Sequence, residues 1–461
     1  MKIRVNRFAL TIWVVMNALG VDQALAQASV GVNPPQIRWS QIETEGYQII
    51  FPENRYNDAS RVANTLDYIL GNDSLTLTYP KIRIPIILQN QTVIPNGFVT
   101  IGPWRSEYNL NPPQFQFAGI TSWLDMLTIH EFRHVQQVAN ARRGTSGKLL
   151  RGVFGQGGWA FYNRAVMPRW FIEGDAVYAE TVYSKGGRGR SPDFEREYRA
   201  LRLSELQYHY EKASFRSFRD YIPSHYHLGY LVTTYARNEF GTEIWDQILN
   251  DTYSKPGFYR FSKAVKHATG YSTKQLYQAA MENLDTSWNQ QDLQIKPLKV
   301  NEVSKASIKT FTNYRFPNYI SERAIIAQKS SLHEIRTVYK LENGNEEKLF
   351  IPGVSLSEHF SLGGGKLVWS EVRFHPRWTG QNYSIIRLYD FNTRKLHKLT
   401  SRSKLSAPGL SRDGTRIAAV ETSPNGKIYL VILDSRTGQH QLRVEVPSGD
   451  FVSFPRWNED N

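Results

Sequence analysis

The sequence His-Glu-Phe-Arg-His begins at His130 and sets two histidines four residues apart. Residues i and i+4 share one face of a helix, so the imidazoles of His130 and His134 can reach the same ion. Glu131 then lies where a carboxylate can take a proton from a water on that ion. This pattern is typical of zinc sites that catalyse hydrolysis. Further along, the run Trp170–Glu180 contains Glu173, a carboxylate able to supply a third ligand.

Zinc in a catalytic site takes three protein ligands and leaves one position for water. Glu131 would act as the general base that accepts the proton of this water and passes it to a leaving amine. The residues after His134 exclude one ligand arrangement. A metzincin needs glycine three residues and histidine six residues after the second histidine, but Gln137 and Asn140 stand there.

Two helices are predicted to position these residues. The first runs from Gly119 to about Ala141, with Thr121 or Ser122 as the N-cap, so the histidines fall in its middle. The second begins near Pro168 and carries the segment Glu173–Tyr183. The helical repeat places a further carboxylate, seven residues after Glu173, on the same face of this second helix.

This second carboxylate is Glu180, two helical turns beyond Glu173. From there it can accept a hydrogen bond from the imidazole of a metal ligand and raise the basicity of that imidazole. A solvated or ion-paired glutamate is the alternative interpretation.

Other elements follow from hydrophobic periodicity. We expect strands at Gly46–Phe51, Ile82–Leu88 and Asn96–Ile101, and an amphipathic helix at Ala59–Leu70. Residues 204–289 are predicted to be largely helical.

The segment between the two metal-site helices, residues 141–170, holds six basic residues, six glycines and no acidic residue. Its aromatic residues are Phe154, Trp159, Phe161, Tyr162 and Trp170. Such a segment suits a flap over the site or a contact with an anionic membrane or envelope surface. A pair of short helices packed on the domain is the alternative.

The N-terminus has the pattern of a secretory signal peptide. Lys2, Arg4 and Arg7 precede the apolar run Phe8–Met16, and small residues near position 26 offer a cleavage site. We therefore expect residues 1–28 to be removed and the protein to be periplasmic or secreted. A membrane anchor is the alternative, but Asn17 and Asp22 interrupt the apolar stretch, which is short for a membrane span.

Composition narrows the metal chemistry and the partners. The 461 residues include no cysteine, which excludes disulfides and thiolate zinc ligands, so any metal must be held by histidine and carboxylate. The formal net charge of +14 favours an anionic surface or acidic substrate. Export argues against nucleic acid, and a merely solvated basic surface is the alternative.

Beyond about residue 300 the sequence repeats. Ser406–Gly414 aligns with Ser453–Asn461, and Phe360–Glu371 aligns with Leu410–Glu421. The spacing is that of a four-stranded propeller blade, with a Ser-Arg-Asp-Gly turn between strands.

These repeats resemble the TolB-type propeller family, whose blades carry a Pro-x-Trp-Ser-Pro-Asp-Gly element. Pro455, Trp457 and Asp460 match it, and Pro408–Gly414 matches it more loosely. Residues 301–461 hold about three blades, whereas a closed ring needs about four. The resemblance therefore implies an incomplete propeller, truncated from a longer protein or forming an open stack, that offers a surface for a protein partner.

The run Trp170–Glu180 resembles the gluzincin pattern Trp-x-x-Glu-Gly-x-Ala-x-Tyr-x-Glu of the aminopeptidase N superfamily and its bacterial relatives. The resemblance implies an α+β, thermolysin-like zinc peptidase domain, one catalytic Zn²⁺ ion and Glu173 as its third ligand. Gluzincins also stabilise the oxyanion with a tyrosine or histidine. Tyr226 is the candidate for this role, and His225 or His227 could take it instead.

Two departures qualify the resemblance. No Gly-x-Met-Glu-Asn motif precedes His130, so the carboxylate that would grip a free amine is missing and an endopeptidase is favoured over an aminopeptidase. The connection from His134 to Glu173 is also about twice as long as usual in that family. In gluzincins, the strand corresponding to Asn96–Ile101 lies at an edge and pairs with an extended peptide substrate.

Together these features predict a signal peptide at 1–28, a gluzincin-like peptidase domain at 29–300 and a partial TolB-like propeller at 301–461. Two other functions stay open. One is a non-catalytic envelope scaffold that binds partners through the propeller and basic surface, although a structural zinc site has no need of Glu131. The other is a gluzincin-fold hydrolase of non-peptide substrates.

Overall fold

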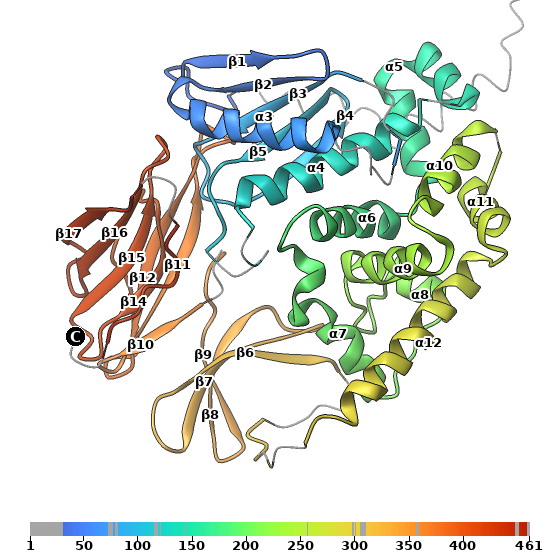
Figure 1. Ribbon diagram of the computed structural model, residues 1–461. Helices are drawn as coiled ribbons and strands as arrows, with labels where there is room; N and C mark the ends of the chain where they lie inside the picture. The colour runs from blue at the N-terminus through green and yellow to red at the C-terminus, as the bar shows by residue number, and fades with distance from the viewer. Residues whose placement is uncertain are drawn as a thin grey trace, which may run out of the picture.

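The structure is a computed structural model in which helices and a mixed sheet are followed by separate antiparallel sheets (Figure 1). It describes residues 31–71, 77, 78, 82–114, 119, 121–142, 144–255, 257–296, 299, 301–304, 310–355, 359–447 and 451–458. The expected signal peptide at 1–28 and Asp460 of the propeller match lie outside these residues. No helix among them combines the length and apolar character needed to cross a bilayer.

The described N-terminal residues form a five-stranded sheet in the order β1-β2-β3-β5-β4. Its strands are β1 (Trp39–Glu43), β2 (Tyr47–Pro52), β3 (Ile84–Gln89), β4 (Gly97–Ile101) and β5 (Trp104–Asn109). β2, β3 and β5 run parallel, whereas β1 and β4 pair antiparallel and form the two edges. The strands expected from the sequence correspond to β2, β3 and β4.

Helices pack against this sheet and make up most of the described residues from 110 to 292 (Figure 1). They are α3 (Tyr56–Leu70), α4 (Trp123–Asn140), α5 (Thr145–Val166), α6 (Arg169–Val182), α7 (Pro192–Leu203), α8 (Tyr210–Phe215), α9 (His225–Phe240), α10 (Ile244–Ser254), α11 (Arg260–Thr269) and α12 (Thr273–Asp292), with short 3-10 turns η1 (Glu53–Arg55) and η2 (Arg188–Arg190).

The boundaries differ slightly from those expected. α3 begins three residues earlier than predicted, and α4 begins at Trp123 rather than near Gly119. Ser122 occupies the N-cap of α4 but makes no side-chain capping bond, and the Thr121 hydroxyl bonds the Ser184 hydroxyl instead.

α4 lies between two apolar cores, and this fixes its position. Phe132 and Val135 pack with the buried faces of α3 and the sheet, whereas Val138 belongs to the core of the later helices. In that second core, the rings of Trp170, Phe171, Trp245 and Phe261 are in mutual contact. Because burial of apolar surface drives folding, α4 is held on both sides and is nearly all buried.

Three four-stranded antiparallel sheets, each built from consecutive strands, make up the described residues from 312 to 445. The first contains β6 (Thr312–Tyr319), β7 (Ala324–Ser331), β8 (Thr337–Glu342) and β9 (Asn345–Phe350); the second β10 (Ser361–Gly363), β11 (Lys366–Phe374), β12 (Asn382–Asp390) and β13 (Lys395–Lys398); the third β14 (Leu405–Leu410), β15 (Arg416–Thr422), β16 (Ile428–Asp434) and β17 (His440–Glu445).

Each of these sheets packs against the next. Phe350 stacks on Trp369 between the first and second sheets, and Val368 shares a core with Ile417 between the second and third. The turn beginning at Ser411 lies between β14 and β15, as the repeat predicted. The four-stranded units therefore have the size and strand order that the repeat indicates.

Asn382 of the second sheet and Lys404, just before the third, also hold the loop that leads into β4. The Asn382 side chain accepts a hydrogen bond from Val93 N (2.6 Å) and donates one to Thr92 Oγ1 (2.8 Å), and Asn382 is buried. Lys404 Nζ bonds the carbonyl oxygens of Gln91 and Asn382, and burial lowers the pKa of Lys404 to about 8. These contacts fix the approach of the chain to the edge strand.

Candidate metal centre

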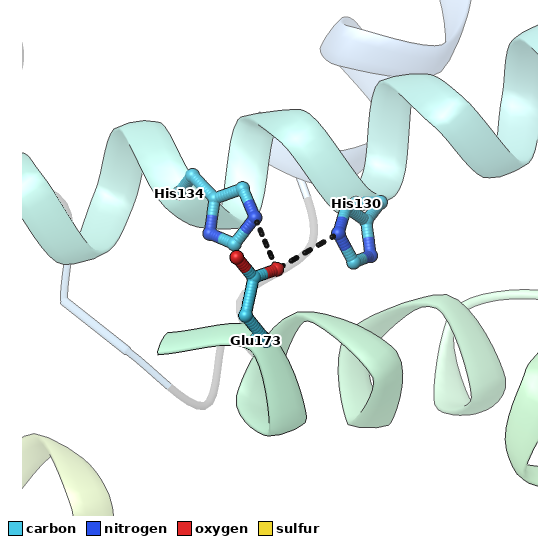
Figure 2. A group of neighbouring side chains, drawn as sticks. All are labelled: His130, His134 and Glu173. Carbon is cyan, nitrogen blue, oxygen red and sulfur yellow. Dashed lines mark ion pairs between the residues drawn. The ribbon is translucent and has the colours of Figure 1, made fainter. Parts of the chain in front are cut away.

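His130 and His134 project from α4 toward Glu173 on α6, and the three side chains point at one another (Figure 2). Glu173 Oε2 lies 3.8 Å from His130 Nε2 and 3.4 Å from His134 Nε2. One ligand atom from each residue falls within 4.8 Å of the other two. The structure thus brings together the three residues that the sequence indicated as metal ligands.

Local sequence explains why α6 presents Glu173 here. Pro168 occupies the N-cap of α6 in an extended conformation, so Glu173 falls one turn into the helix. Gly174 then lets α6 touch α9, because a Cβ at this position would lie only 2.0 Å from the carbonyl carbon of Gly229. The two glycines allow close packing that brings the first turn of α9 to the same site.

Glu131 lies beside the ligands in a nearly closed environment. It is 4% exposed, and its Oε2 has no hydrogen-bond partner among the described residues. Gly97 of the edge strand β4 lies against it, since a Cβ built there would be 3.1 Å from Glu131 Cγ. Burial raises the pKa of Glu131, and the nearby imidazoles of His134 and His130 oppose this shift. A carboxylate with a raised pKa beside a candidate metal site suits a general base.

The outer nitrogen of His130 is held by Glu180. The distance from His130 Nδ1 to Glu180 Oε2 is 3.0 Å, and Glu180 is fully buried. Arg188 of η2 clamps the same carboxylate, with Nε 2.7 Å from Oε1 and Nη2 2.9 Å from Oε2. Burial disfavours the carboxylate anion, but the charge of Arg188 and the bond to His130 lower the pKa of Glu180 to about 2.

This arrangement decides which nitrogen of His130 faces the site. Arg188 Nη2 also approaches His130 Nδ1, to 2.9 Å, but a guanidinium accepts no hydrogen bond. A metal ion on Nε2 requires the proton of the neutral imidazole to be on Nδ1. The Glu180 carboxylate is the neighbouring group that can accept the hydrogen bond from this N–H. Glu180 therefore contacts the imidazole of His130 and is buried rather than solvated at the surface.

His134 has a different support, which begins with Gln137. Gln137 Oε1 lies 3.0 Å from His134 Nδ1, and Gln137 Nε2 donates to Asp175 Oδ2 at 2.8 Å. Asp175 is fully buried and bonds the guanidinium groups of Arg133 and Arg237, whose charges hold its pKa well below the usual range against the effect of burial. A buried ion cluster thus fixes the amide that orients His134.

Tyr226 lies at the start of α9, within reach of the ligands. Its ring stacks on that of His130 with centroids 6.3 Å apart, and the Arg188 guanidinium carbon lies 5.0 Å from the Tyr226 ring centroid. Burial and the negative charge of Glu173 raise the pKa of the Tyr226 phenol, so it keeps its proton at neutral pH. A protonated phenol here can donate a hydrogen bond into the site.

The two histidines beside Tyr226 are placed less favourably. His227 Nδ1 lies 2.9 Å from Ser224 Oγ and 3.7 Å from Glu197 Oε2. His225 is buried, and burial together with the charge of Arg169 lowers its pKa to about 4. Of the three candidates for the oxyanion role, Tyr226 is the one whose ring stacks on His130.

The donor set fits a zinc ion. Two imidazole nitrogens and one carboxylate oxygen converge, and Glu173 Oε2 is buried without a hydrogen bond among the described residues. The electrostatics favour a cation between these residues. Burial lowers the pKa of His134, but the hydrogen bond and negative charge of Glu173 outweigh burial and raise this pKa to about 9. The same imidazoles hold the pKa of Glu173 well below its usual range, again against burial. The negative charge of Glu173 therefore favours a cation between the imidazoles, and a metal ion bound there would displace the proton from His134.

Sequence reasoning missed three residues of this site. Arg188 follows α6 in a turn without a recognisable motif, and the position of Gln137 after His134 indicates only that a metzincin is excluded. Gly97 was seen as part of a strand, not as the neighbour of Glu131. A signal existed for Gln137, because position i+3 from His134 lies on the same helical face.

No protein-family model matches the chain, and no curated protein matches its sequence. Some solved peptidase structures show a partial likeness to it. A two-domain M1 zinc metallopeptidase bound to L-arginine is 15% identical, with a TM-score of 0.26 over 54% of this chain and 51% of that one. A Mycobacterium tuberculosis puromycin-hydrolyzing peptidase is 17% identical, with a TM-score of 0.24 over 32% of this chain and 23% of that one.

The β-propeller domain of the Trilobed protease from Pyrococcus furiosus is 16% identical, with a TM-score of 0.22 over 30% of this chain and 44% of that one. The chain covers less than two thirds of each of these structures. Likeness at these TM-scores assigns neither a fold nor an activity, so the function must be argued from the site itself.

Proposed function

We propose that this chain is an exported zinc metallopeptidase in which His130, His134 and Glu173 hold one Zn²⁺ ion. The observation that carries the proposal is the convergence of these ligand atoms within 4.8 Å, beside the buried carboxylate of Glu131. A purely structural metal site has no use for a buried, unbonded carboxylate next to its ligands. The thermolysin-like fold of the first domain and the propeller nature of the repeats belong to the same proposal.

Each residue has a role that its position supports. Zinc bound there would polarise a substrate carbonyl and lower the pKa of a water molecule. Glu131 accepts the proton of that water and delivers it to the leaving amine, and its raised pKa suits both transfers. Tyr226, which keeps its proton, donates a hydrogen bond to the oxyanion that develops on the carbonyl oxygen.

The substrate proposed is a peptide in extended conformation. β4 is an edge strand of the sheet and passes directly over Glu131 at Gly97, so its free edge lies next to the reacting groups. Main-chain pairing along such an edge holds a peptide without requiring a free terminus. An endopeptidase therefore fits better than an aminopeptidase.

The test compares the wild-type chain with Glu131→Gln, which keeps the shape of the side chain and removes the base. Zinc is measured by plasma mass spectrometry after loading and desalting, and cleavage is followed on a complex peptide mixture by mass spectrometry. We expect one zinc per chain in both proteins and a cleavage rate at least about 10²-fold lower in the variant.

The matched control is Glu239→Gln, which removes an exposed carboxylate from α9 and should leave both readouts unchanged. Full zinc occupancy without turnover of any peptide would contradict the peptidase and favour a binding protein. Equal cleavage by wild type and Glu131→Gln would exclude Glu131 as the base.

A further inference from the structure

The helix α5 has an outward side that nothing in the described structure covers. Residues 151–157 are all exposed, and a Cβ built on Gly152, Gly155 or Gly157 would meet no atom within 4 Å. At Gly155 the backbone leaves helical geometry, with φ of 61° and ψ of −145°, so α5 consists of two helical segments joined by a kink. The exposed residues gather around this kink.

One part of the exposed side is strongly basic. A pocket of about 430 Å³ is lined by Arg142, Lys148, Arg151, Gly152, Gly155 and Gln156. Arg142 and Arg151 are anchored over the buried ring of Trp159, with guanidinium carbons 5.5 and 5.8 Å from its centroid. No ion pair joins Lys148 or Arg151 to a carboxylate in the described part of the chain, and residues 141–170 include no Asp or Glu.

The other part is apolar. Leu149 and Val153, one turn apart on the first segment, are 67% and 64% exposed. Phe154 is 40% exposed, and Phe161 on the second segment is 49% exposed. Large exposed apolar side chains next to Lys148 and Arg151, which make no ion pair among the described residues, are not what a solvated helix face needs. They are the composition of a helix that rests on a membrane surface.

We propose that α5 docks this chain onto the surface of an anionic lipid bilayer. Leu149, Val153 and Phe154 enter the boundary between headgroups and acyl chains, and the pocket of Arg142, Lys148 and Arg151 receives lipid phosphate. Charge complementarity favours this occupant over a protein partner, because a bilayer supplies many phosphates and no fixed shape. The open glycines allow headgroups to approach the backbone.

The docked surface would adjoin the proposed substrate edge. Gln156 Oε1 accepts a hydrogen bond from Trp104 N at 3.1 Å, and the Trp104 ring packs at a tilt of 47° against that of Trp159, with centroids 5.0 Å apart. Trp104 begins β5, whose partner strand is β4. The membrane contact would therefore lie at the outer end of the edge strand, although the docking itself does not depend on the proposed peptidase activity.

The test is co-sedimentation of the full chain with vesicles, either phosphatidylglycerol and phosphatidylcholine at 30:70 or phosphatidylcholine alone. Each basic residue near an anionic surface contributes about fivefold to partitioning, so Lys148→Gln with Arg151→Gln should weaken binding to the anionic vesicles about 25-fold. Leu149→Ser with Val153→Ser should weaken it by at least about tenfold. Residues 1–30 are common to all variants, so differences between them report on α5.

Matched controls remove similar groups elsewhere: Lys395→Gln with Lys398→Gln on β13, and Leu442→Ser with Val444→Ser on β17, all exposed. Both should bind the vesicles like wild type, and all variants should keep the wild-type zinc content. Equal vesicle binding by the α5 variants and wild type overturns the proposal. So does an α5-dependent dimer in light scattering without vesicle binding, which would assign the face to a second copy of the chain.

Discussion

Replacing Glu180 by glutamine should weaken the proposed metal centre without changing a proposed ligand. Glu180 is ionised at neutral pH, because its pKa is about 2, and it is fully buried. Oε1 accepts from Arg188 N (2.9 Å) and Nε (2.7 Å), and Oε2 contacts His130 Nδ1 (3.0 Å) and Arg188 Nη2 (2.9 Å). An amide has one acceptor oxygen, so its NH₂ group must face donors in either orientation.

The size of the effect follows from these contacts. At least two hydrogen bonds to a charged group are lost, each contributing about 1.5–3 kcal/mol. Arg188, whose side chain is only 13% exposed, also loses its counter-ion. Breaking a buried pair in this way costs about 3–5 kcal/mol of stability. Loss of the group that orients a ligand imidazole typically lowers metal affinity about 10–100-fold, which is about 1.4–2.8 kcal/mol.

Two assays check these values. Competition with a fluorescent chelator gives the zinc Kd of wild type and Glu180→Gln, and calorimetry of the zinc-free proteins gives the loss of stability. Glu322→Gln, which removes an exposed carboxylate between β6 and β7, is the control and should change neither. A zinc Kd within twofold of wild type, with an unchanged unfolding temperature, would refute the role assigned to Glu180.

Three further predictions concern neighbouring groups. Tyr226→Phe should lower kcat about 10²–10³-fold with zinc retained and KM nearly unchanged, and an unchanged kcat would exclude the phenol from the oxyanion role. Gly97→Ala places a Cβ 2.6 Å from Leu127 Cδ1 and 3.1 Å from Glu131 Cγ, so both side chains must shift and kcat should fall several-fold with zinc retained, whereas Gly102→Ala, which meets nothing within 4 Å, should have no effect. Equal kcat values for these two variants would show that β4 does not constrain Glu131. Asp175→Asn leaves buried guanidinium groups without their carboxylate and should lower the free energy of unfolding by about 3–5 kcal/mol in urea denaturation; a change below about 1 kcal/mol would contradict the account of this cluster.

The parts of the site that the sequence could predict are those set by helical periodicity. The spacing of His130 and His134 placed both on one face of α4, and the seven residues from Glu173 to Glu180 placed both carboxylates on one face of α6. These relations are local, because the rotation per residue of a helix fixes them. The start of α6 could also be predicted from a local signal, because Pro168 marks it.

Contacts made through turns and between distant strands could not be predicted in this way. Arg188 reaches Glu180 because the chain reverses at Gly187, where φ is 88° and a side chain would meet Thr181. β1 and β5 went unpredicted because their sequences, Trp39–Glu43 and Trp104–Asn109, are mainly polar and give no apolar run. Their order in the sheet, which brings Gly97 to Glu131, depends on pairing partners far apart in sequence.

In the C-terminal repeats, too, local features could be predicted and contacts between distant segments could not. Period and turn residues indicated four-stranded units, and the structure has three such sheets among its described residues. Nothing in the repeat indicates that Asn382 would bind Thr92 and Val93 ahead of β4. That contact joins two regions 290 residues apart and arises only when both surfaces are folded.

The most direct test of the metal centre is anomalous X-ray diffraction from crystals of the zinc-loaded chain, measured above and below the zinc absorption edge. We predict one strong anomalous peak at about 2.0–2.2 Å from His130 Nε2, His134 Nε2 and a Glu173 carboxylate oxygen. The difference between the two wavelengths identifies the element. A peak at other residues, or no peak between α4 and α6 in fully loaded protein, would contradict the account.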